Sequence, residues 1–97
     1  MSPKDNIKEL IASKLSHFRE KHQIKSLGIF GSYVRGEAKK RSDVDILVEF
    51  EEPISLFRFV DLELELSELV GKKVDLVMKS ALKPMIGKMI LEEVEYL

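Results

Sequence analysis

Cysteine is absent from this chain of 97 residues, which excludes a disulfide framework and any thiolate metal site. An excess of charge of either sign is missing as well, because 16 Lys and Arg residues stand against 17 Asp and Glu residues. The resulting net charge of -1 argues against a broad nucleic-acid-binding surface and against a polybasic face that seeks membranes. Any chemistry on phosphate groups must therefore depend on a local cluster of residues.

The chain also lacks internal repeats, low-complexity segments and a recognisable linker. Its first residues, MSPKDNIKEL, do not have the apolar run of a signal peptide, so a cytoplasmic protein with no membrane partner is expected. A hydrophobic content of 44% suffices for one core at this length. We therefore expect a single domain over residues 1–97.

Hydrophobic periodicity predicts that helices and strands alternate along the chain. The predicted helices cover residues 3–21, 32–38, 56–70 and 82–96, and the predicted strands cover residues 25–30, 44–50 and 73–78. Residues 62–66 also alternate like a strand, but the wider apolar stripe of segment 56–70 favours a helix that closes at Gly71. The order αβαβαβα predicts an α/β (α+β) fold in which helices cover one face of a small mixed sheet.

Carboxylates gather on one face of the predicted sheet. Strand 44–50 alternates so that Val44, Ile46, Val48 and Phe50 share one face, which leaves Asp43 and Asp45 on the other. Asp75 takes the corresponding face of strand 73–78. Side chains two residues apart on a strand stand roughly 6 to 7 Å apart at their roots, so two carboxylates can reach one metal ion or a pair of ions. Ligands made only of oxygen favour Mg²⁺ or Mn²⁺ over Zn²⁺.

The segment GSYVRG precedes these acids and has the outline of an anion cradle. Gly31 lets the backbone approach a ligand closely, and Ser32 falls where a helix is predicted to begin. Arg35, one turn later, can add a bidentate contact to the same phosphates. The basic triplet at residues 39–41 is more simply a solvated loop, and His17 and His22 lack the spacing of a metal site.

A phosphate cradle beside a cluster of metal-binding acids describes chemistry on a nucleoside triphosphate. The chain has no G-x-x-x-x-G-K-[ST] loop, no protein-kinase motif set and no complete calcium-binding loop. Transfer of a nucleotidyl group is the chemistry that fits best.

The run GSYVRGEAKKRSDVDILV, from Gly31 to Val48, resembles the G-S-x-x-R-G and S-D-x-D signature of the polymerase-beta-like nucleotidyltransferase superfamily. The later VDLV, from Val74 to Val77, resembles its third acidic strand. At this length the chain is similar to the minimal nucleotidyltransferases (MNT or MntA-like), which act as antitoxins beside HEPN-domain toxins. One mild departure is Val34, which stands where many members have alanine.

The resemblance implies a role for each candidate residue. Two Mg²⁺ ions, or Mn²⁺ in their place, would act with ATP as the substrate, and the third carboxylate would serve as both ligand and base. The matching positions are Gly31 and Ser32 for the triphosphate, Arg35 for the motif arginine, Asp43 and Asp45 for the metal pair, and Asp75 for the third carboxylate.

The resemblance also implies the reaction, in which AMP from ATP is transferred to a tyrosine hydroxyl of a cognate HEPN toxin and pyrophosphate is released. A different class of function stays open, namely an antitoxin that neutralises its toxin by binding alone. Modification of a small molecule such as an aminoglycoside is the least favoured, because the chain has no room for an acceptor domain.

Some apolar residues lie off the predicted core stripes. Phe57 and Leu64 are two of them, and helix 82–96 is apolar over a wide arc. This surface could bind a partner or a second copy of the chain, or could simply be exposed, as in many small domains.

Overall fold

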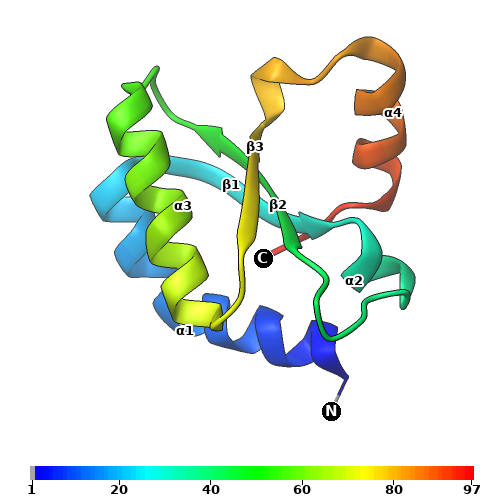
Figure 1. Cartoon of the computed structure of the whole chain (residues 1–97). Coiled ribbons are helices and arrows are strands. Elements are labelled where there is room, and N and C mark those ends of the chain that lie inside the picture. Colours follow the sequence, from blue (N-terminus) through cyan, green and yellow to red (C-terminus); the bar gives the residue numbers. More distant parts are fainter. Residues whose placement is uncertain (1) are drawn as a thin grey trace.

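The computed structural model of the chain describes residues 2–97. Four helices and a four-stranded sheet alternate along most of these residues (Figure 1). The elements are α1 (Pro3–His22), β1 (Ile24–Phe30), α2 (Ser32–Arg35), β2 (Val44–Phe50), α3 (Leu56–Val70), β3 (Val74–Met78), the 3-10 turn η1 (Lys79–Ala81), α4 (Pro84–Glu93) and β4 (Glu95–Tyr96).

The sheet is mixed, with the strand order β3-β2-β1-β4. Strand β1 pairs in antiparallel fashion with β2 and with β4, whereas β2 and β3 run parallel. Helix α3 supplies the crossover between the two parallel strands, as such a connection requires. The predicted α/β (α+β) class with a small mixed sheet is therefore confirmed.

One face of the sheet carries the core, and α1 and α3 cover it. The alternation predicted for β2 holds, since Val44, Ile46 and Val48 are all buried on this face. The cluster of buried residues comprises Ile7, Ile11, Phe18, Ile24, Leu27, Ile29, Tyr33, Val44, Ile46, Val48, Leu62, Leu66, Val74 and Leu76. Burial of this apolar face obliges the neighbouring side chains of β2 to point to the other side of the sheet.

The ends of the two long helices follow local sequence signals. The hydroxyl of Ser2 accepts a hydrogen bond from the backbone N–H of Asp5, and Pro3 occupies the first helical position of α1. Ser55 caps α3 in the same way, and Gly71 ends α3 in the left-handed region at φ 70°.

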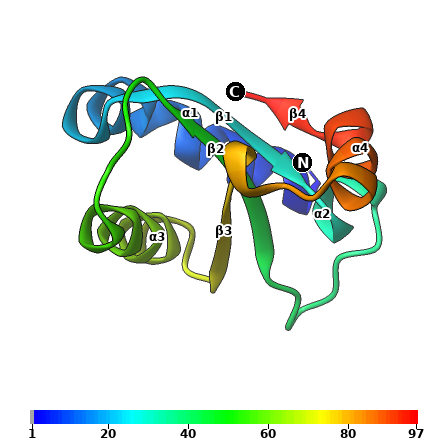
Figure 2. The same cartoon turned by 90° about the horizontal axis from the view of Figure 1, so that it is seen from above.

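The C-terminal segment differs from the prediction of one helix over residues 82–96. Helix α4 ends at Glu93, and the following residues form β4, whose Tyr96 pairs with Gly28 of β1. Helix α4 also lies outside the helical layer: in both Figure 1 and Figure 2 it stands on the opposite side of the strands from α3. The helix predicted over residues 32–38 is likewise shorter, because Gly36 ends α2 at Arg35. A strand of two residues has no periodicity, so the sequence could not predict that β4 forms and pairs with β1.

Within residues 2–97, none of the helices combines the length and the apolar composition that crossing a bilayer requires.

A polar cluster joins the C-terminal end of α1 to α3. His22 is buried and its Nε2 atom lies 2.5 Å from Oε2 of Glu65, whereas Oε1 of Glu65 accepts a hydrogen bond from Lys21. Burial alone would raise the pKa of Glu65, but the hydrogen bonds from Lys21 and His22 outweigh it and leave this pKa lowered. The ionised carboxylate therefore stabilises the folded state.

We expect Glu65→Gln to destabilise the protein by about 1 to 3 kcal/mol at pH 7. A lowered folded-state pKa gives stability that is present above the unfolded value of about 4.3 and is lost as the pH falls through the folded value. Urea unfolding at pH 7 and pH 3 should therefore show a large difference from wild type at pH 7 and a small one at pH 3. The exposed Glu68 on the same helix supplies the control, Glu68→Gln. An equal effect of Glu65→Gln at both pH values would contradict the assigned role of its charge.

Candidate active site

The three predicted acids meet at one end of the parallel strand pair. Asp45 of β2 and Asp75 of β3 are partners in the strand register, so their Cα atoms stand about 4.8 Å apart across the sheet. Asp43 precedes β2 by one residue and is about half exposed. Both strands direct their residues of the main core cluster toward α1 and α3, so the carboxylates lie on the opposite, open face, where Leu47 of β2 is also buried.

Asp45 is the most enclosed of the three acids, whereas Asp43 and Asp75 are exposed. Burial raises the pKa of Asp45, and the negative charges of Asp75 and Asp43 raise it further, against an opposing effect of Arg35. The ionised carboxylate is thus held in surroundings that disfavour its charge. A cation placed among these groups would relieve that repulsion.

Gly31 connects the acids to the predicted phosphate cradle. It follows β1 directly and precedes the four-residue helix α2, with φ 80° and ψ -150°. A Cβ atom at this position would overlap the Oδ2 atom of Asp45 and lie 3.0 Å from its Cγ atom. Only glycine satisfies both the positive φ and this close approach. The backbone of the cradle therefore rests directly against the central carboxylate.

Two further predicted residues lie at the same place. Ser32 is the first residue of α2, and its hydroxyl makes no hydrogen bond to any residue between 2 and 97. The guanidinium of Arg35 donates from Nε to Glu37, at 3.1 Å. This hydrogen bond and the neighbouring charge of Glu93 raise the pKa of Arg35. The structure thus assembles Gly31, Ser32 and Arg35 beside the acids, as the sequence predicts.

A carboxylate that sequence reasoning missed also reaches this site. Glu93, the last residue of α4, accepts a hydrogen bond from the backbone N–H of Gly31 at 2.9 Å and binds the guanidinium of Arg35. It adds to the charges that raise the pKa of Asp45. Its neighbours Glu92 and Glu95 make an acidic run in the sequence, and no local signal distinguishes Glu93 from them. Its role follows from the path of α4 in space.

The carboxylates of this site suit a divalent cation only if the substrate supplies further ligands. In the part of the chain that the structure describes, no three His, Cys, Asp or Glu side chains converge into a ready metal cage. Mg²⁺ is, however, usually held by one or two carboxylates together with phosphates of the substrate. Oxygen-only ligands on adjacent strands suit such a shared site, so the residues fit Mg²⁺ that arrives with a nucleotide.

The basic loop after α2 plays no visible part in this arrangement. Its residues 39–41 are exposed, and the hydrogen bond from the Lys39 backbone N–H to Ser42 Oγ at 2.7 Å shapes the loop itself. Lys73 is the basic side chain paired with an acid of the site, at 4.0 Å from Asp43 Oδ2. The loop thus agrees with the simpler interpretation as a solvated segment.

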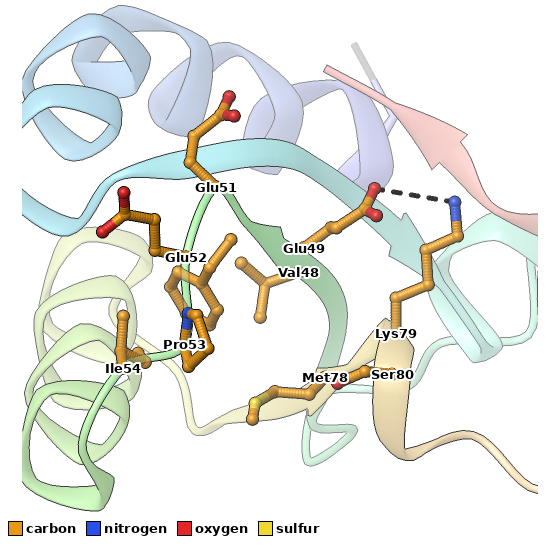
Figure 3. Close-up of a pocket in the computed structure, with 10 residues that line it drawn as sticks. Val48, Glu49, Glu51, Glu52, Pro53, Ile54, Met78, Lys79 and Ser80 are labelled. Carbon is orange, nitrogen blue, oxygen red and sulfur yellow. Dashed lines mark ion pairs between the residues drawn. The ribbon is translucent and has the colours of Figure 1, made fainter.

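A cavity of about 430 Å³ lies elsewhere, at the far end of β2 from Asp45. Figure 3 shows the side chains that line it, with the ion pair between Glu49 and Lys79 at its edge. Its walls are mostly apolar, with Pro53, Ile54 and Met78 among them. It contains none of the predicted site residues, so the chemistry belongs to the open face and not to this cavity.

Comparisons with known proteins identify the family of the chain. A family model described as a nucleotidyltransferase domain matches residues 11–97. The protein adenylyltransferase MntA of Thermococcus cleftensis is 51% identical over 92 residues, which cover 95% of this chain and 93% of that protein.

Two solved structures extend the comparison. One, provisionally described as a minimal nucleotidyltransferase, superposes with a TM-score of 0.84 at 34% identity, over 100% of this chain and 97% of that one. The other is a complex of a tri-AMPylated Shewanella oneidensis HEPN toxin with an MNT antitoxin, with a TM-score of 0.61 over 97% of this chain and 67% of the matched chain. At 17% identity, this second likeness shows the fold alone.

Proposed function

The chain belongs to the nucleotidyltransferase domain family and is a nucleotidyltransferase, and from this premise we propose that it transfers AMP from ATP to a tyrosine hydroxyl of a HEPN-domain toxin. The observation that carries the proposal is the contact between the Gly31 turn and Asp45, whose strand partner is Asp75. This contact supports the proposal because the GSYVRG turn and the group of carboxylates then lie within one small site. The name of the Thermococcus relative and the AMPylated toxin of the Shewanella complex support the acceptor and the transferred group.

The cradle residues act by binding and orientation. The backbone N–H of Gly31, the hydroxyl of Ser32 and the guanidinium of Arg35 would bind the β- and γ-phosphates of ATP. Anchoring these phosphates directs the α-phosphorus toward the acids on β2 and β3, in line with an incoming hydroxyl. The same donors stabilise the charge of the pyrophosphate as it leaves.

The acids act on the attacking group. Asp43, Asp45 and Asp75 would hold two Mg²⁺ ions, and bound Mg²⁺ would supply charge neutralisation at the phosphates and a more acidic hydroxyl. A carboxylate oxygen of the exposed Asp75 would accept the proton of the tyrosine hydroxyl. The bond from the tyrosine oxygen to the α-phosphorus forms as the bond from the α-phosphorus to the bridging oxygen of the β-phosphate breaks, and pyrophosphate leaves with the electron pair.

Labelling with ATP carrying a radioactive α-phosphate tests the proposal. The purified protein would be incubated with labelled ATP, Mg²⁺ and the HEPN-domain protein encoded beside it, and separately with EDTA added. We expect label on the HEPN protein in the first reaction and none with EDTA. If the purified protein binds ATP and Mg²⁺ but the HEPN protein stays unlabelled, the HEPN protein is excluded as the acceptor.

Neutralisation of a toxin by binding alone is a second candidate function, and an exposed apolar surface on α4 favours it. Met85, Ile86 and Met89 are 84%, 60% and 68% exposed, and exposed apolar clusters often mark protein interaction sites. A variant that no longer transfers AMP, yet still protects growing cells from the toxin, would support this function over a catalytic one.

A further inference from the structure

The carboxylate of Glu93 already occupies part of the anion cradle. Its Oε2 atom accepts a hydrogen bond from the Gly31 backbone N–H at 2.9 Å, and Arg35 Nη1 donates to Oε1 and Oε2 at 3.0 and 3.1 Å. These donors are the same ones that the proposed function assigns to the triphosphate. A backbone amide and a guanidinium that converge on one anion form a typical phosphate-binding set.

Two anions cannot use these donors at once, and each would repel the other. We propose that Glu93 competes with the triphosphate for the cradle and so sets the affinity for nucleotide: it fills the cradle in the nucleotide-free protein and is displaced when ATP binds. This inference rests on the proposed function, because it concerns how that same site admits its substrate.

The contacts of Arg35 favour competition over a positioning role for Glu93. The Nε atom of Arg35 donates to Glu37 at 3.1 Å, so the guanidinium keeps an anchor when Glu93 leaves. Nη1, the donor that turns toward Glu93, would then be free for a phosphate oxygen. A role limited to orienting Arg35 would not account for the hydrogen bond that Glu93 accepts from the Gly31 backbone N–H.

The surroundings of Glu93 leave its side chain a path to solvent. Gly87 is the one residue of α4 that is buried, while its larger apolar side chains are exposed or partly exposed. The Glu93 side chain itself is 23% exposed, at the rim of the site. Rotation of this side chain toward solvent therefore requires no repacking of the core. Its departure would also remove one of the charges that crowd Asp45.

Nucleotide affinity of Glu93 variants tests the inference. Calorimetry would measure the binding of a non-hydrolysable ATP analogue with Mg²⁺ to wild type, Glu93→Ala, Glu93→Gln and the control Glu92→Ala, which removes an exposed neighbour on α4. We expect Glu93→Ala to bind about fivefold to tenfold more tightly, as loss of an exposed ion-paired competitor predicts. Glu93→Gln keeps one accepting oxygen without the charge and should show a smaller gain, and Glu92→Ala should match wild type.

The gain should depend on the phosphates. Inorganic triphosphate with Mg²⁺ should show the same tightening in Glu93→Ala, and adenosine should show none. Affinity of Glu93→Ala and Glu93→Gln that equals or falls below wild type, in proteins with unchanged thermal unfolding, would overturn the inference and leave the proposed function intact. Absence of nucleotide binding by wild type and all variants would overturn both, whereas tighter binding without AMP transfer to any HEPN protein would overturn only the proposed acceptor.

Discussion

Replacing Asp45 with asparagine is expected to reduce AMP transfer by at least about 10³-fold, since a central charged group of the site is lost. The same change should leave the protein as stable as wild type or slightly more stable. Burial and the charges of Asp75, Asp43 and Glu93 raise the pKa of Asp45. Ionisation of this carboxyl therefore costs more free energy in the folded protein than in the unfolded one, and its charge lowers stability at neutral pH. Asparagine has nearly the same shape without the charge, and it removes this repulsion.

Two measurements on the Asp45→Asn protein separate these effects: initial rates of label transfer to the HEPN protein, and thermal unfolding in the absence of nucleotide and Mg²⁺. Asp61→Asn is the matched control, because Asp61 is an exposed residue of α3, the helix that covers the core face of the sheet. Its transfer rate should stay within about twofold of wild type, as for most surface substitutions. Transfer at the wild-type rate by Asp45→Asn would show that Asp45 is not part of the metal-binding pair.

Gly31→Ala is expected to damage both stability and activity. The residue has φ 80° and ψ -150°, a region essentially restricted to glycine, which costs a residue with a Cβ atom on the order of 1 to 3 kcal/mol. The added methyl group would also overlap Asp45 Oδ2, so the carboxylate must move away from its position beside the cradle. Together these effects should lower stability by about 2 to 4 kcal/mol and abolish detectable transfer, because small misplacements at a reacting centre are costly.

Gly71→Ala separates the backbone strain from the steric overlap. Gly71 has a similar φ of 70°, but no atom lies within 4 Å of the position its Cβ would take. This variant therefore suffers the backbone strain alone, and it should lose about 1 to 2 kcal/mol of stability while transferring AMP at the wild-type rate. Urea unfolding and the labelling assay would be applied to both variants. Equal activity of Gly31→Ala and Gly71→Ala would contradict the close approach of the Gly31 turn to Asp45.

Local patterns in the sequence predicted most of this fold. Strand 44–50 and helix 56–70 have the predicted bounds, because the first alternates at every position except Leu47 and the second lies between the Ser55 cap and Gly71. The prediction was wrong where the signal was short or tertiary. The two residues of β4 have no periodicity of their own, and their pairing with β1 shortens the last helix to ten residues.

The candidate residues were predictable to a similar degree. Asp45 and Asp75 share the open face because period-two alternation aims both away from the core, and the Gly31 turn was recognisable from its composition. Their roles as metal ligands and phosphate donors remain proposals. Glu93 was not predictable, since it belongs to an acidic run whose members look alike.

The sequence by itself determined the αβ order of the chain, the face on which the acids lie and the motifs of nucleotidyl transfer, because these depend on interactions between residues close in sequence. Only the tertiary structure decided that Gly31 rests against Asp45, that α4 stands on the side of the sheet opposite α3, and that Glu93 binds the same donors as the expected phosphate. Such contacts join residues up to 62 positions apart. They depend on how the elements pack in space, which no local pattern records.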